Sequence, residues 1–220
     1  MNFLSESVST YHNSLKYSCT HKNGVRSSKR TDMLNEQAAN MILKNLAKPD
    51  DWEVLKEEKI ACARANHNQP NKKFTIDVLI KNKYTGKNIY VLLKSIESSY
   101  NKNSNNFANC VMGETQRIYG TGEIHGSTLK EQRKDDITLF LTYICKELPN
   151  GKKIEEVKYC TPSDNDLRIF SPHIHQVSVM LNNNLSHPSK ESLLASINGK
   201  VVEERSAIKK FEEFLNDANK

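Results

Sequence analysis

The sequence lacks the features that place a protein in a membrane or outside the cell. No apolar run approaches the roughly 18 residues needed to cross a bilayer. Residues 1–20 contain no basic start followed by an apolar segment, so we expect no secretory signal. The five cysteines are scattered and form no CxxC pair, which argues against a zinc site and a disulfide framework. These absences favour a protein of the reducing cytoplasm.

Aromatic residues are also scarce, at 7% of the chain, which does not favour a stacking surface for single-stranded nucleic acid. Charge is plentiful instead: 26% of the residues are charged, and the formal net charge is +6. A positive balance suits a polyanionic partner better than an acidic one. The 220 residues are enough for one domain with a core. We expect a polar, basic arm over residues 1–31 and a single domain over residues 32–220.

The most informative stretch is residues 74–94, where two apolar runs flank a polar turn that contains Gly86. This pattern is typical of a β-hairpin. Side chains alternate along a strand, so Asp77 and Lys94 meet if the faces they occupy on the two strands coincide. Two interpretations are open. The charges are ordinary strand-end charges, or the Asp holds a divalent cation and the Lys lies near an attacking water and a scissile phosphate.

Two helices carry further acidic residues that could join such a site. An apolar stripe of helical period predicts a helix over residues 32–47, with Glu36 in its second turn. A second helix is predicted over residues 106–119, where Glu114 and Arg117 are three residues apart on one face. Glu114 is either half of an exposed ion pair or the carboxylate that the hairpin end lacks.

A long polar loop is expected between the hairpin and this second helix. It starts directly after Lys94 and includes Glu97. Loops in such places carry function more often than core segments do. Its many Asn, Lys and Ser side chains are of the kinds that hydrogen-bond phosphates and base edges.

The remaining patterns predict an α/β (α+β) fold. Residues 51–65 are ambiguous, with a helix first and then a strand. The apolar run 137–145 predicts a central strand flanked on both faces, and residues 173–181 alternate like a strand. His173 and His175 share a face there, but no third ligand of matching spacing is evident. We also predict a strand over residues 154–160, helices over residues 189–195 and 203–218, and connections over residues 120–134 and 161–165.

The order of these elements, with the charged hairpin, resembles the PD-(D/E)XK nuclease superfamily, in particular the type II restriction endonucleases. Three stretches carry the resemblance, which spans residues 32–195. They are Ile76-Asp77 followed by Val91–Lys94, the first helix with Glu36, and the strand around residues 176–179 followed by residues 187–192. The resemblance implies a restriction-endonuclease-like core, in which helices flank a central mixed β-sheet.

The sequence departs from the family pattern at Leu92, because the family has a Glu two residues before the Lys. Some family members supply this carboxylate from the following helix, which here implies Glu114, with Glu97 as the second choice. The resemblance then implies one or two Mg²⁺ ions held by Asp77 and the relocated glutamate.

In this scheme Glu36 is a further candidate metal ligand. Lys94 orients the attacking water or neutralises the developing negative charge.

The implied activity is Mg²⁺-dependent, sequence-specific hydrolysis of double-stranded DNA that leaves 5′-phosphates. A palindromic target implies a homodimer. Two alternatives stay open: a non-catalytic nucleic-acid-binding protein on the same fold, motivated by Leu92, and a basic α/β interaction module without a nucleic-acid role. From side-chain type and position, the expected DNA contacts are Lys102, Asn103, Asn106, Asn109, Arg117, Gln176, Ser178 and Asn182.

Overall fold

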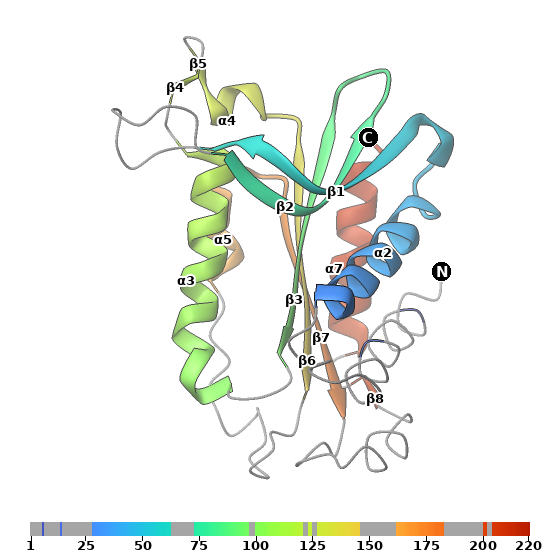
Figure 1. Ribbon diagram of the computed structural model, residues 1–220, viewed down its shortest axis with the longest axis vertical. Coiled ribbons are helices and arrows are strands. Elements are labelled where there is room, and N and C mark those ends of the chain that lie inside the picture. The colour runs from blue at the N-terminus through green and yellow to red at the C-terminus, as the bar shows by residue number, and fades with distance from the viewer. Residues whose placement is uncertain are drawn as a thin grey trace.

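A six-stranded mixed sheet forms the centre of the protein (Figure 1). The computed structural model describes residues 28–62, 73–96, 100–120, 123–124, 127–145, 162–182, 200–201 and 204–220, with Glu6 and Ser14 as single residues. The sheet has the strand order β1-β2-β3-β6-β7-β8. Its strands are β1 (Trp52–Ala61), β2 (Lys73–Asn82), β3 (Asn88–Ile96), β6 (Ile137–Cys145), β7 (Ile174–Asn182) and β8 (Lys200–Val201).

Helices cover both faces of this sheet. They are α2 (Ser28–Leu43), α3 (Tyr100–Tyr119), α4 (Leu129–Gln132), α5 (Asp164–Arg168) and α7 (Glu204–Ala218), with a 3-10 turn η2 (Pro49–Asp51) before β1. Two short strands, β4 (Glu123–Ile124) and β5 (Ser127–Thr128), form a separate ribbon. Helices α2 and α7 pack on one face, and α3 with α5 packs on the other (Figure 1).

Strand β6 lies inside the sheet and runs parallel to β3 on one side and to β7 on the other. Its residues are buried on both faces, which explains why residues 137–145 read as a nearly continuous apolar run. The predicted central strand is therefore confirmed, as are the strand at β7 and the terminal helix at α7. In α7 the side chains of Phe211, Phe214 and Leu215 form the buried stripe.

The predicted hairpin is also confirmed, because β2 and β3 pair antiparallel. The side-chain oxygen of Asn82 accepts hydrogen bonds from the backbone N–H groups of Tyr84 and Thr85, at 3.0 and 2.9 Å. Gly86 has a φ of +74°, in the left-handed region that glycine adopts at little cost. This turn sets the register in which Val78 lies opposite Val91.

The alternation of side chains along β2 breaks at Asp77. Val78 packs into the core on the α2 and α7 side, whereas Ile76, two residues earlier, packs into the core on the α3 side. The β1–β2 ladder skips one residue on each strand at this level, Glu57 of β1 and Asp77 of β2, and Glu57 has a φ of +51°. The two strands therefore bend at this level, and their outer halves curl over the end of α3 (Figure 1).

Two sequence predictions are wrong. Residues 52–61 form a strand from the start, and the expected helix there does not exist, because nine residue pairs bind this segment to β2. The polar loop expected after Lys94 becomes helical at Tyr100, so Lys102 and Asn103 lie in the first turns of α3. The helix predicted over residues 32–47 is confirmed as α2, with earlier bounds, Ser28–Leu43, so that it starts inside the segment expected as a polar arm.

Other predictions differ only in part. Short elements β4, β5 and α4 occupy the expected connection at 120–134, and α5 begins within the loop expected at 161–165. The strand predicted at 154–160 and the helix predicted at 189–195 lie outside the described residues. Among the described helices, none combines the length and apolar character needed to span a bilayer.

Candidate active site

Three charged side chains from three elements meet on the α3 side of the sheet. They are Asp77 from β2, Lys94 from β3 and Glu114 from α3. The ammonium nitrogen of Lys94 donates a hydrogen bond to Glu114 Oε1 at 2.9 Å. The carboxylate of Asp77 accepts a hydrogen bond from the backbone N–H of Leu93 at 2.9 Å and acts electrostatically on Lys94. We call these three residues the charged cluster.

The sequence pattern of α3 explains the position of Glu114. This residue comes three positions after Val111 and four before Ile118, both fully buried against the sheet. Positions three and four apart lie on one side of a helix, so the Glu114 side chain is carried toward β3. Only 13% of the Glu114 side chain is exposed, against 33% of the Lys94 side chain.

Buried contacts hold the C-terminal end of α3 against the sheet. The guanidinium of Arg133 donates a hydrogen bond to the backbone oxygen of Ile118 at 2.6 Å. The hydroxyl of Tyr119 donates to the backbone oxygen of Asp136 at 3.2 Å. Because Glu114 lies one turn before these anchors, the helix that carries it is fixed on the sheet rather than free to slide.

The environment of the charged cluster shifts two pKa values. Burial raises the pKa of Asp77, and the Leu93 N–H and the Lys94 ammonium offset this only in part. Burial by itself would lower the pKa of Lys94, but the carboxylates of Glu114 and Asp77 outweigh it, so the pKa lies above its usual value. Lys94 is therefore protonated at neutral pH, and Asp77 pays an energetic penalty for being ionised.

One oxygen of the cluster has no hydrogen-bond partner. Glu114 Oε2 is buried and accepts no hydrogen bond within the described part of the chain. A buried carboxylate oxygen left in this way is costly unless another group binds it. A divalent cation is one such group, and Mg²⁺ is typically bound by one or two protein carboxylates together with waters and phosphate oxygens. The two carboxylates of the cluster fit this requirement.

A third ligand from the chain is not in place. No group of three or more His, Cys, Asp or Glu residues in the described ranges is arranged to hold a metal. Glu97 lies outside the described residues. Glu36 is on α2, which covers the opposite face of the sheet, and its exposed carboxylate accepts a hydrogen bond from Lys56 at 3.1 Å. The structure does not bring Glu36 to the charged cluster.

Leu92 occupies the position at which the resembled family carries a Glu. Its side chain is 2% exposed and packs in the apolar cluster beneath α3. A carboxylate at this position would lie in a cluster of buried apolar side chains and directly beside Phe140 of β6, so the local packing favours an apolar residue. The second carboxylate comes from the helix instead.

The expected DNA contacts divide into two groups. On α3, Asn106, Asn109 and Arg117 are exposed, and the Arg117 guanidinium lies 5.4 Å from the centre of the Phe74 ring. Lys102 and Asn103 lie on the same helix, but their side chains are outside the described part of the structure.

On β7, Gln176 is already bound, because its amide donates to the Pro162 backbone oxygen and to Asp164 Oδ1, each at 3.0 Å. Asn182 ends the strand, and its side chain is not described. Ser178 is aligned with Thr142 of β6, which is aligned with Lys94. It is therefore about 10 Å from Lys94, two strand spacings away on the same face of the sheet.

Sequence reasoning missed two neighbours of the cluster. Cys110 is exposed one helical turn before Glu114, close enough for its thiolate form to favour the charged form of Lys94. Because Cys110 precedes Glu114 by four residues in a predicted helix, the sequence could have placed both on the same side of that helix. Thr142 is a buried polar residue in the middle of the central strand, and a threonine inside an apolar run was the only hint of it.

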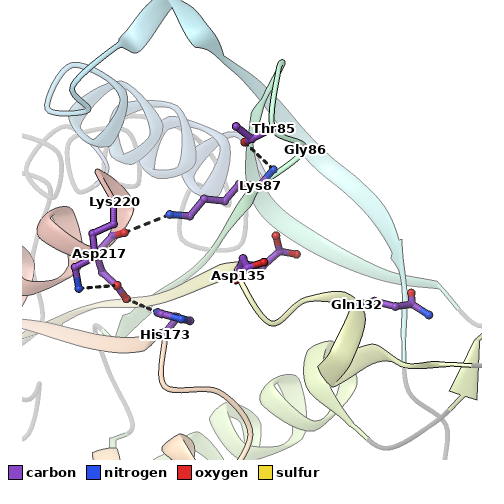
Figure 2. Close-up of a pocket in the computed structure, with 9 residues that line it drawn as sticks. Thr85, Gly86, Lys87, Gln132, Asp135, His173, Asp217 and Lys220 are labelled. Atoms are coloured by element: carbon purple, nitrogen blue, oxygen red, sulfur yellow. Dashed lines mark hydrogen bonds and ion pairs between the residues drawn. The ribbon is translucent and has the colours of Figure 1, made fainter.

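A second polar region lies at the opposite end of the sheet, around a cavity of about 450 Å³ (Figure 2). Asp217 Oδ2 binds ring nitrogens of both His173 and His175, at 2.8 and 3.0 Å. Lys87 donates to the Asp217 backbone oxygen at 3.3 Å, and Lys220 donates to Asp217 Oδ1 at 3.4 Å. These groups bind one another, so this region clamps α7 onto β7 and the hairpin turn.

Comparison with known proteins gives no relative for this arrangement: no family model matches the chain, and neither curated proteins nor solved structures give a significant match. The fold and the charged cluster therefore define the protein only as a mixed α/β protein with a half-buried lysine–dicarboxylate cluster. Any function has to be argued from that cluster.

Proposed function

We propose that this chain is a Mg²⁺-dependent, sequence-specific double-stranded DNA endonuclease with a restriction-endonuclease-like core. One observation supports the proposal above all others. Asp77, Lys94 and Glu114 converge from a hairpin and the helix that follows it, as two carboxylates and one ammonium around a buried unpaired oxygen. Two carboxylates can hold a metal ion and an ammonium can stabilise charge on a phosphate, which suits metal-assisted hydrolysis of a phosphodiester.

The roles follow from the chemistry of each group. Asp77 and Glu114 would hold the cation, because both offer carboxylate oxygens on the same side of the sheet. Bound Mg²⁺ would lower the pKa of a water and neutralise charge on the phosphate. Lys94, whose pKa lies above its usual value, would stay protonated and would orient the water or neutralise the developing charge. The products would carry 5′-phosphates.

The exposed face of α3 is the proposed contact surface for DNA. Asn106, Asn109 and Arg117 lie on the helix that carries Glu114, and amide and guanidinium groups are suited to base edges and phosphates. Recognition of a palindromic DNA sequence would require a homodimer with two-fold symmetry. We propose that such a dimer acts in the cytoplasm.

Digestion of a long DNA tests this function. The purified chain is incubated with DNA and Mg²⁺, and the fragment ends are sequenced. We expect discrete fragments that share one terminal sequence and carry 5′-phosphates. Asp77→Ala and Lys94→Ala should abolish cutting and leave DNA binding in place. Cleavage that persists in either variant would contradict the proposed roles.

A second candidate is a nucleic-acid-binding protein on the same fold that does not cut. The buried Leu92 favours it, because the carboxylate usual at this position of the resembled family is absent. In that case the protein with Mg²⁺ would retard plasmid DNA on a gel, with a steep salt dependence, and leave it intact. Discrete cleavage fragments would rule this candidate out.

A further inference from the structure

The ammonium of Lys94 pairs directly with one carboxylate and lies within electrostatic reach of a second from another element. It is 2.9 Å from Glu114 Oε1, and Asp77 acts on it electrostatically from the neighbouring strand. The side chains of this pair are 33% and 13% exposed, so water screens their charges only in part. Lys94 therefore supplies most of the positive charge that balances the two acids.

One ammonium does not satisfy this site completely. Two carboxylates and one ammonium leave a net negative charge, and Glu114 Oε2 remains buried without a hydrogen-bond partner in the described part of the chain. A buried site with surplus negative charge and an unbound oxygen attracts a further cation or exchanges its cation for one of higher charge.

We propose that Lys94 is the resident counter-ion of the cation site, and that a divalent cation loads by displacing its ammonium from Glu114. This inference rests on the proposed function and concerns the regulation of the same site. Binding of the divalent cation is then coupled to release of the Lys94 ammonium from Glu114. The lysine becomes available to a substrate phosphate only when the divalent cation has taken its place between the carboxylates.

The chain contains a matched pair that should not behave in this way. Lys56 and Glu36 form an ion pair of similar length, 3.1 Å, on the other side of the sheet. Their side chains are 45% and 59% exposed, so solvent already compensates both charges. Replacement of Lys56 should therefore not increase the affinity of the protein for a cation.

Titration with Mn²⁺, followed through the electron paramagnetic resonance signal of the free ion, tests the inference. The proteins compared are wild type, Lys94→Met and Lys56→Met. We expect Lys94→Met to bind Mn²⁺ about tenfold more tightly than wild type or better, because its carboxylates no longer have to break a charge-assisted hydrogen bond. Lys56→Met should bind as wild type does.

Thermal unfolding gives a second readout that does not depend on activity. Lys94→Met leaves two buried acids without a counter-ion, so Mn²⁺ should raise its unfolding temperature more than that of wild type. Lys94→Gln is measured in parallel, so that the result does not depend on one variant folding.

The outcomes separate this inference from the proposed function. Saturable Mn²⁺ binding of equal affinity in wild type and both Lys94 variants would overturn the counter-ion role and leave the cation site standing. No saturable binding in wild type or in either Lys94 variant would remove the cation site, and with it the proposed nuclease and the counter-ion role together.

Discussion

Leu92 and Glu114 together show which of two neighbouring positions supplies an acid to the charged cluster. Leu92 is packed among apolar side chains beneath α3, where a charge would be costly. Glu114 reaches the same lysine from the helix above. For a cation, the origin of a carboxylate oxygen matters less than its position, so the charged cluster contains two acids although position 92 supplies none.

Asp77 should cost the folded state stability at neutral pH. Its folded pKa is raised by burial, so above the unfolded value of about 3.9 the native state resists an ionisation that the unfolded chain undergoes freely. The neutral variant Asp77→Asn avoids this penalty. It should therefore unfold at a higher temperature than wild type at pH 7, with the difference disappearing below about pH 4.

Thermal scans from pH 3 to pH 8 check this expectation, with Glu212→Gln on the exposed side of α7 as the control. The same Asp77→Asn protein should lose DNA cleavage by a factor on the order of 1,000 or more if Asp77 holds the cation. An Asp77→Asn variant that is less stable than wild type across the whole pH range would contradict the burial argument.

Much of the cluster was predictable at this scale, and the reason is local periodicity. Alternation along each strand made a shared face for Asp77 and Lys94 one of two possibilities, and the chemical need for a second acid pointed to Glu114, with Glu97 as the second choice. The alignment of Lys94 with Thr142 and Ser178 was not predictable, because the register of parallel strands depends on contacts between distant segments.

Among the elements, the bend in β1 and β2 gives Asp77 its position. The bend requires Glu57 to adopt a φ of +51°, which a residue with a side chain adopts only at a cost. Glu57→Gly should remove this cost and raise the free energy of unfolding by about 1 kcal/mol.

Urea unfolding measures this effect, with the adjacent Glu58→Gly as a matched control. Glu58 is the same residue type on the same strand, but it does not have a positive φ. Its replacement should lower stability by about 0.5–1 kcal/mol, as glycine does in a regular strand. Equal destabilisation by both variants would show that the bend carries no strain at Glu57.

The clamp between α7 and β7 should make stability depend on acid pH. Burial by itself would raise the pKa of Asp217, but hydrogen bonds from His175 and His173 outweigh it and lower the pKa. A lowered folded pKa adds stability above the unfolded value of about 3.9, which is lost as pH falls through the folded value. Asp217→Asn should cost on the order of 1–3 kcal/mol at pH 7.

Unfolding by urea at several pH values between 2.5 and 7 checks this. The wild type and Asp217→Asn curves should converge at the acid end, whereas Asp135→Asn, an exposed residue near the same cavity, should follow wild type throughout. A constant difference between wild type and Asp217→Asn at all pH values would mean that packing, not the ionised carboxylate, holds the clamp.

Elements were harder to predict where tertiary contacts decide the outcome. Charged and apolar residues in the segment 52–61 follow neither a clear helical nor a clear strand periodicity. Pairing with β2 is what makes this segment a strand. Residues 100–105 are polar and read as a loop, yet they continue the helix that Phe107 and Val111 anchor in the core. The continuous apolar run of β6 and the helical periodicity of α7 gave correct predictions.

For the whole molecule, the proposed function predicts a particular assembly. A palindromic target read by equivalent surfaces requires two chains related by a two-fold axis. Sedimentation velocity should therefore show a complex of two chains per DNA duplex, with the mass of the duplex plus twice the chain mass, when wild type is bound to its DNA site with Ca²⁺ or when an Asp77→Asn chain is used. A complex with one chain per DNA would contradict the dimer and leave the cluster chemistry unaffected.

The central claim is that Glu114, reaching Lys94 from α3, supplies the second carboxylate of a cation-dependent nuclease site. The most direct test compares the rate of Mg²⁺-dependent plasmid cleavage by wild type, Glu114→Gln and Glu36→Gln, two glutamates that each pair with a lysine on opposite faces of the sheet. We predict that Glu114→Gln loses cleavage by a factor on the order of 100 or more and that Glu36→Gln cuts as wild type does. Wild-type cleavage by Glu114→Gln, or no cleavage by any of the three proteins, would contradict it.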